Sequence, residues 1–108
     1  MQQNDFTKFV VQAFEDLSKM FAEKNEQYAT GDPVANFRTG ARLRYGSACN
    51  AHMYEVAKDY VGKHIAHVYN NDVYGPKVEE SLADIAVYSV IMLYLRSQAQ
   101  NEVHCHER

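Results

Sequence analysis

The sequence predicts an all-α protein, a bundle of about four helices in a single domain that covers residues 1–108. Two observations carry this prediction: apolar residues recur with the 3.6-residue helical period along most of the chain, and no stretch alternates as a β-strand would. With 108 residues, of which 46% are hydrophobic and 23% charged, the chain has the length and composition of one ordinary globular domain.

The first half of the chain is predicted to form one long and one short helix. The long helix follows a cap at Asn4 or Asp5 and extends to about Asn25. Its apolar positions keep the helical period: Phe6, Phe9, Val10, Ala13, Phe14, Leu17, Met20 and Phe21. A cluster of helix-breaking residues at 28–33 separates it from the short helix, which we expect over residues 35–45.

The second half is predicted to form two long helices joined by a turn. Residues 51–69 carry one apolar stripe, and Asn, Asp, Gly and Pro residues at 70–76 punctuate its end, with Pro76 in the first turn of the next helix. That helix covers residues 77–100 and contains an apolar run at 85–95, which spans roughly 16 Å, about half of a bilayer core. We therefore expect a buried helix or a subunit interface, no membrane span, and a frayed tail at 101–108.

Two acidic pairs suggest a metal site. Glu80 and Asp84 are four residues apart, so they share one helical face at the start of the apolar helix, where burial requires a compensating cation. Glu55 and Asp59 repeat this spacing, and the segment between the pairs allows an antiparallel hairpin that brings them face to face. Such a cage suits Mg²⁺, although Glu55, Asp59 and Lys63 also fit an exposed ladder of ion pairs.

Four polar residues outside these pairs are candidates for binding a substrate. Lys24 and Tyr28 continue the inward stripe of the first helix, where core residues are expected; alternatively, Lys24 extends to water and Tyr28 simply packs. Asn36 can contact a base edge, and Arg38 can bind phosphate oxygens in bidentate fashion. Arginines at such positions are also common as plain surface charges.

Metal-assisted hydrolysis is the reaction class that the sequence favours. The chain lacks the motifs GxSxG, GxxxxGK[ST], HExxH and GxGxxG. A divalent ion would neutralise a triphosphate and orient a water molecule, while Lys24, Lys63 and Arg38 stabilise charge on the phosphate oxygens. His64, which lies on the apolar stripe of its helix, or a carboxylate would accept the proton from that water.

Composition limits the partners and the compartment. The net charge of −3 carries no basic surplus, so nucleic acid is not expected as the main partner, although Arg38, Arg42 and Arg44 leave single-stranded binding as a weaker alternative. The two cysteines form no CxxC motif, and the first residues do not resemble a signal peptide. We therefore expect reduced thiols and a cytoplasmic location.

Several short motifs, in their order and spacing, resemble a known family. Residues 24–28 (KNEQY), 36–37 (NF), 63–64 (KH) and 80–88 (ESLADIAVY) are similar to phage and bacterial proteins of the nucleotide modification associated domain type. These proteins resemble in turn the MazG-like, all-α nucleoside triphosphate pyrophosphohydrolases. The resemblance covers residues 6–96.

The resemblance implies a Mg²⁺-dependent enzyme of phage nucleotide metabolism that forms dimers or tetramers and releases a nucleoside monophosphate and pyrophosphate. Glu80 and Asp84 match the carboxylates of the last motif helix, with Glu55 and Asp59 in place of the earlier pair. The positions expected around the nucleotide are matched by Lys24, Tyr28, Asn36 and Lys63. Because the family's carboxylates are usually three apart rather than four, a catalytically inactive helical module for oligomerisation or binding is the alternative.

Overall fold

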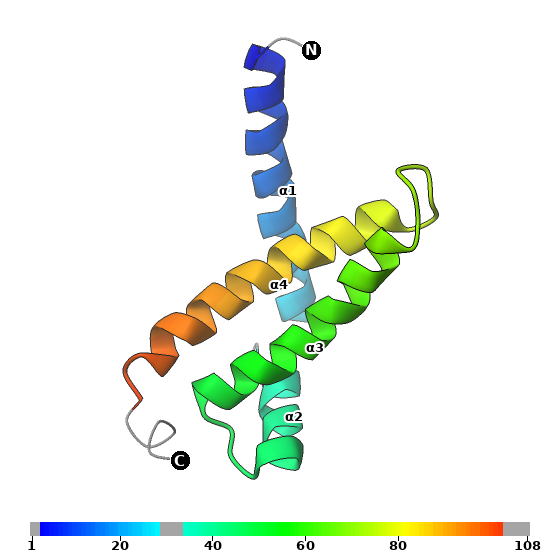
Figure 1. Ribbon diagram of the computed structural model, residues 1–108. Helices are drawn as coiled ribbons and strands as arrows, with labels where there is room; N and C mark the ends of the chain where they lie inside the picture. The colour runs from blue at the N-terminus through cyan, green and yellow to red at the C-terminus, as the bar shows by residue number, and fades with distance from the viewer. Residues whose placement is uncertain (1–2, 29–33, 103–108) are drawn as a thin grey trace. The chain divides into compact units, whose positions relative to one another are not determined.

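The computed structural model describes residues 3–28 and 34–102, without the side chains of Gln3 and of residues 24–28. The described ranges contain four α-helices and no strand, which confirms the predicted all-α class (Figure 1). The helices are α1 (Gln3–Tyr28), α2 (Ala35–Tyr45), α3 (Asn50–Tyr69) and α4 (Val78–Ala99). The chain divides into two units, Met1–Pro33 and Val34–Arg108, which are described separately.

The first unit contains α1 alone. This helix extends three residues beyond the predicted end at Asn25, because Glu26 and Gln27 are good helix formers. Along its apolar stripe Val10, Ala13 and Leu17 are half-buried. Lys24 and Tyr28 belong to this helix, but their side chains lie outside the described residues, so their predicted roles stay predictions.

In the second unit, α2 packs antiparallel against α3. The ring of Phe37 near the start of α2 contacts Tyr60, and Tyr45 at its end stacks on His52 in the first turn of α3. Gly40 lies between these contacts, where an added Cβ would stand 2.9 Å from the Cγ1 atom of Val56. The two helices therefore approach closely because residue 40 has no side chain.

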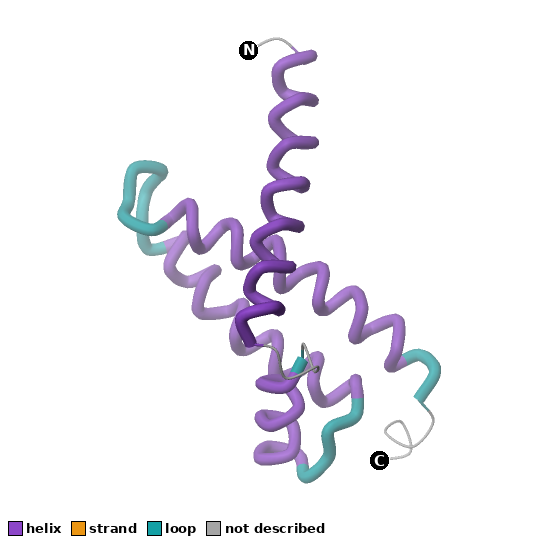
Figure 2. The backbone as a smooth tube through the Cα atoms, turned by 180° about the vertical axis from the view of Figure 1, so that it is seen from behind, coloured by secondary structure: helices purple, strands orange, loops and turns teal. Residues whose placement is uncertain are grey.

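Helices α3 and α4 form an antiparallel hairpin, and both views show them side by side (Figures 1 and 2). Hydrogen bonds fix the turn that joins them: His67 Nε2 donates to the carbonyl oxygen of Pro76 (2.8 Å), and Gly75 N donates to that of Asp72 (3.0 Å). Pro76 was predicted in the first turn of α4, but the helix begins at Val78 after Lys77, whose φ is 61°.

The core of this unit lies where α2, α3 and α4 meet. Its buried members are Phe37, Ala41, Met53, Val56, Ala57 and Leu95. Ala41 and Ala57 are 0% exposed, and small side chains at these positions allow close helix packing. Leu95 is also 0% exposed, and burying its side chain contributes about 2 kcal/mol.

Glu102 fastens the open end of the hairpin. Its carboxylate accepts hydrogen bonds from Asn50 N (2.9 Å), Asn50 Nδ2 (2.7 Å) and Ala51 N (3.4 Å), at the start of α3. The side chain of the N-cap residue Cys49 makes no capping hydrogen bond, so the carboxylate of Glu102, which follows α4 in the chain, caps α3 instead. Glu102 is therefore fixed, although we expected it in a frayed tail; residues 103–108 lie outside the described residues.

The outer face of α4 is apolar and open to solvent. Leu82, Val90, Leu93 and Tyr94 are between 53% and 66% exposed, so this face of the helix is not buried within one chain, and the other expected role of the helix, a subunit interface, stays a prediction. No helix in the described part of the chain is long and apolar enough to span a membrane. The predicted homo-oligomer stays a prediction.

The expectation of reduced thiols is wrong for Cys49, which is disulfide-bonded. The chain has one other cysteine, Cys105, which lies outside the described residues. Because disulfides are rare in reducing compartments, the cysteines no longer support the predicted cytoplasmic location, which stays a prediction.

Candidate functional site

A histidine and a carboxylate face each other across the α3–α4 hairpin. His64 Nε2 lies 3.7 Å from the Oδ2 atom of Asp84, and each side chain is 29% exposed. The antiparallel register that places Tyr60 against Tyr88 also places His64 opposite Asp84, one turn further along both helices. The pair is thus partly shielded from water and still reachable by a ligand.

Aromatic rings support this pair from the hairpin interior. Tyr88 stacks on His64 with ring centroids 5.7 Å apart and contacts Tyr60 edge-on at 6.1 Å. Phe37 contributes from α2, with edge contacts at 5.2 Å to Tyr60 and 6.0 Å to Tyr88. Such edge-to-face contacts hold ring orientations, so the imidazole of His64 rests on a fixed surface.

The surroundings of Tyr88 disfavour its charged form. Burial raises the pKa of the Tyr88 hydroxyl above its ordinary value, and the neighbouring Asp84 carboxylate and Tyr60 act in the same direction. Tyr88 therefore stays a neutral phenol around neutral pH, and its hydroxyl can donate a hydrogen bond.

Two further predicted site residues, Lys63 and Glu80, lie within four residues of the pair in the sequence. Glu80 lies one helical turn before Asp84, in the first turn of α4, where the helix dipole favours a negative charge. Lys63 precedes His64 on α3, and the side chains of both Glu80 and Lys63 are exposed. The helices that carry the pair thus also carry one exposed carboxylate and one exposed cation.

Glu55 and Asp59 lie away from this pair. Glu55 binds Lys58 at 3.0 Å, and the Glu55 carboxylate raises the pKa of Lys58; Asp59 pairs with Arg44 of α2. Asp59 lies five residues before His64, about 7.5 Å along the helix axis, so it is level with the middle of α4 rather than with Asp84. Among the residues whose side chains the structure describes, 4–23 and 34–102, no three His, Cys, Asp or Glu form a group that could hold a metal ion.

The two predicted α2 residues flank a core residue. Asn36 and Arg38 stand on either side of Phe37, whose ring lies against Tyr60 and Tyr88. Asn36 is exposed and Arg38 is half-buried. Because Phe37 contacts Tyr60 and Tyr88, the first turn of α2 lies about one helical turn away from the His64–Asp84 pair.

Sequence reasoning missed the aromatic residues of the site. Tyr60 lies on the apolar stripe of residues 51–69, and Tyr88 lies in the apolar run 85–95 and in the motif 80–88; neither was predicted as a site residue. Each lies four residues from a member of the polar pair: Tyr60 from His64, and Tyr88 from Asp84. Residues with this spacing share one helical face. A polar residue four positions from an aromatic residue on the same stripe was therefore the sequence signal that could have identified Tyr60 and Tyr88.

Comparisons with known proteins do not identify the chain: no protein-family model, curated protein or solved structure matches it. The resemblance to MazG-like proteins therefore stays a prediction, and the geometry of the hairpin is the basis for a functional proposal.

Proposed function

We propose that this protein is a Mg²⁺-dependent nucleoside triphosphate pyrophosphohydrolase whose site is built on the α3–α4 hairpin. The observation that supports this proposal best is the His64–Asp84 pair, whose side chains lie 3.7 Å apart and are each 29% exposed. Lys63 precedes His64 in the chain, and Glu80 lies one helical turn before Asp84. A proton acceptor, two carboxylates that can hold a metal ion and a cation are groups that can catalyse phosphoanhydride hydrolysis.

Glu80 and Asp84 are the residues that would hold the metal. Mg²⁺ commonly takes one or two carboxylates from the protein and completes its shell with water and substrate phosphates, so a pair one helical turn apart fits this use. Glu55 and Asp59 are engaged with Lys58 and Arg44, so they are left out of the set. When bound, the ion would supply charge neutralisation for the phosphates and a more acidic water molecule.

The chain's own side chains have separate roles in this proposal. Lys63 carries positive charge toward the phosphates from the solvent side, and Arg38 adds a second cation from α2. His64 accepts a proton at Nε2 from the attacking water, and stacking on Tyr88 holds its ring in place. Asn36 reaches the base or sugar from the start of α2, where it is exposed.

The test is a panel of ribo- and deoxynucleoside triphosphates with Mg²⁺, in which pyrophosphate and nucleoside monophosphate are quantified. Asp84→Asn should lower the rate by about 10²-fold or more, since it removes a charged group of the site. Asp16→Asn, an exposed carboxylate of α1, is the matched control and should keep the wild-type rate. If no nucleotide is hydrolysed, the proposal fails.

Asp59→Asn separates two arrangements of the carboxylates. If only Glu80 and Asp84 serve the metal, this variant loses no more than a surface ion pair and keeps most of the activity. An equally inactive Asp59→Asn would instead support the four-carboxylate cage expected from the sequence.

The second candidate is a binding or oligomerisation module without catalysis. The open apolar face of α4, with Leu93 66% and Val90 60% exposed, favours this alternative, because contiguous exposed apolar side chains mark contact surfaces. The module predicts no turnover and no rise in melting temperature with Mg²⁺ and nucleotide, which a thermal-shift titration measures.

A further inference from the structure

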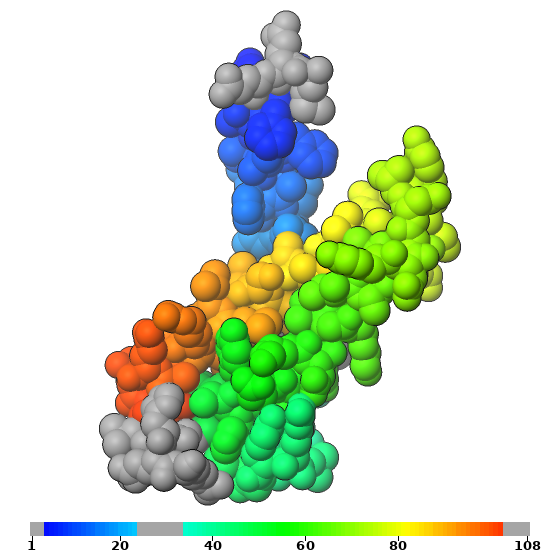
Figure 3. Space-filling model, viewed as in Figure 1, coloured from blue at the N-terminus to red at the C-terminus, as the bar shows by residue number. Residues whose placement is uncertain are grey.

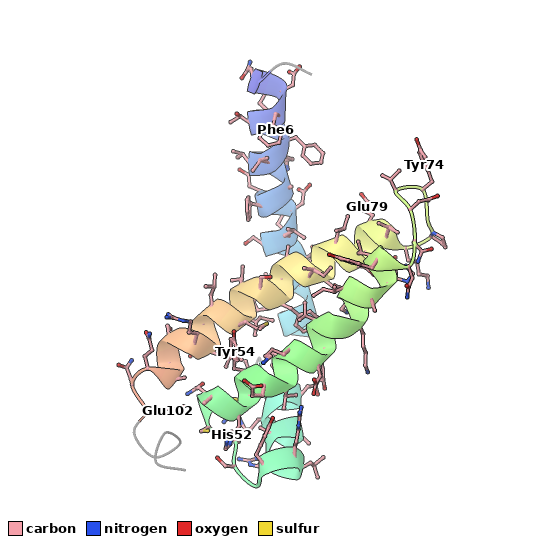
Figure 4. All side chains as sticks on the ribbon, viewed as in Figure 1. Phe6, His52, Tyr54, Tyr74, Glu79 and Glu102 are labelled. Carbon is pink, nitrogen blue, oxygen red and sulfur yellow. The ribbon has the colours of Figure 1, made fainter. Side chains whose placement is uncertain are left out.

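The turn between α3 and α4 presents large side chains to solvent. Tyr69, Val73 and Tyr74 are 86%, 78% and 92% exposed, and Tyr74 lies at the far end of the loop (Figure 4). We call these three residues, with the charged groups of residues 72–80, the hairpin tip. In the space-filling view the tip projects beyond the packed part of the hairpin (Figure 3).

Hydrogen bonds within the turn hold the hairpin tip. Asn71 Nδ2 donates to the carbonyl oxygen of His67 (2.9 Å), and Tyr74 N donates to Asp72 Oδ1 (2.9 Å). A Cβ at Gly75 would stand 2.6 Å from the Cβ of Asn71, so only glycine fits this turn as it is built. Exposed aromatic side chains on a fixed loop cost little entropy when they bind, and tyrosine is enriched in protein interfaces.

A surface of complementary character lies at the other end of the unit. The last turn of α2 exposes Leu43, which is 84% accessible, between Arg42 and Arg44. We call these three residues the α2 end. Helix α2 contains no carboxylate, and Arg44 is held by Asp59 of the same chain, which leaves Arg42 as an additional exposed cation.

The charges of the two surfaces are opposite. Around the hairpin tip, the exposed carboxylates of Asp72, Glu79 and Glu80 outnumber the one cation, Lys77. Each surface thus combines exposed apolar side chains with an excess of one charge, negative at the hairpin tip and positive at the α2 end, and opposite charges of this kind steer and orient two partners.

The two surfaces cannot meet within one chain. Tyr45, next to the α2 end, stacks on His52 in the first turn of α3, whereas Tyr69 of the hairpin tip is the last residue of α3. These two levels of α3, at His52 and Tyr69, are about 26 Å apart along the helix axis. Only a second copy of the chain can bring one surface onto the other.

We propose that the hairpin tip of one copy docks on the α2 end of a second copy. This contact is head-to-tail, since each copy uses a different surface, and it leaves one free tip and one free α2 end that further copies can occupy. The proposal does not rest on the proposed hydrolase activity and is measured without nucleotide.

The test is light scattering coupled to size-exclusion chromatography on the full chain. The wild type should show a concentration-dependent mass above the 12.4 kDa of one chain. Leu43→Asp and Tyr74→Asp should each weaken association at least about tenfold. Leu43→Asp sets a carboxylate against the acidic tip, and Tyr74→Asp removes the most exposed aromatic side chain of the tip; both sites are exposed enough to keep the fold.

Mixing the two variants provides the decisive arm. Leu43→Asp keeps an intact tip and Tyr74→Asp keeps an intact α2 end, so the mixture should form a 1:1 complex of two chains. Raising the salt from about 0.1 M to about 1 M, which shortens the Debye length from about 10 Å to about 3 Å, should weaken this complex. A mixture that stays monomeric, or a complex that salt does not weaken, overturns the proposal.

Leu93→Asp is the matched control on the outer face of α4. It also places a charge on an exposed apolar side chain, but outside both proposed surfaces, and should leave the association unchanged. If Leu93→Asp dissociates the wild-type assembly while Leu43→Asp and Tyr74→Asp do not, the contact lies on α4 and the head-to-tail proposal is wrong.

Discussion

Gly40→Ala is expected to destabilise the protein, although alanine is the better helix former. Replacing glycine by alanine inside a helix normally contributes about 1 kcal/mol of stability. At Gly40 the new Cβ would stand 2.9 Å from Val56 Cγ1, closer than such atoms approach. Val56 is only 5% exposed and, being β-branched, has a stiff χ1, so it cannot turn away.

The magnitude follows from these two opposing effects. Overpacking a well-packed core costs about 1–3 kcal/mol, which cancels or exceeds the propensity gain and leaves Gly40→Ala up to about 2 kcal/mol less stable than the wild type. Gly62→Ala is the control, because a Cβ there meets nothing within 4 Å and only the gain of about 1 kcal/mol applies.

Urea denaturation of the wild type and both variants gives the free energies of unfolding directly. The two alanine variants should differ by about 1–3 kcal/mol, with Gly62→Ala the more stable. Equal stabilisation by both substitutions would refute the close approach of α2 to α3. The same approach brings Phe37 into contact with Tyr60 and Tyr88, so without it the aromatic contacts between α2 and the candidate site would no longer be expected.

Three further predictions concern the ends of the hairpin and its aromatic interior. Glu102→Ala should lower the free energy of unfolding by about 1–2 kcal/mol through loss of the α3 cap, and Glu102→Gln by less; an unchanged urea midpoint would refute the capping role. Gly75→Ala should lower the melting temperature, because its Cβ would stand 2.6 Å from Asn71 Cβ; an unchanged or higher value would contradict the tight turn. The pKa of Tyr88 is raised on folding, so the folded protein holds this proton more tightly and loses stability as the pH rises above about 10. Denaturation at a series of alkaline pH values should show a smaller loss for Tyr88→Phe, and an equal loss would contradict the raised pKa.

The helices could largely be predicted because their signals are local. Apolar periodicity and the breaker residues gave α2 at residues 35–45, as the structure has it, and placed α3 and α4 to within one residue at each end. The start of α4 differed because Lys77 adopts a positive φ, which a lysine rarely does and which no local pattern indicates. The role of Glu102 was equally hidden, since its partners Asn50 and Ala51 lie half the chain away.

The candidate site was predicted in part, for a physical reason. Spacing shows which residues share a helical face, and this identified Glu80, Asp84 and His64 as polar residues on apolar helices. It does not show which residues of two helices lie at the same level, and that register decided that His64 rather than Asp59 faces Asp84. The partners of Asp59 and Glu55, which are Arg44 and Lys58, likewise follow from side-chain geometry and not from sequence order.

The measurement that tests the central claim most directly is the product analysis of a nucleoside triphosphate incubated with Mg²⁺ and the full chain, beside Asp84→Asn and Asp16→Asn. We predict that the wild type and Asp16→Asn react at the same rate, and that both release one pyrophosphate for each nucleoside monophosphate. Asp84→Asn should be slower by about 10²-fold or more. Orthophosphate as the first product, or an Asp84→Asn variant as fast as the wild type, would contradict a hydrolase built on the α3–α4 hairpin.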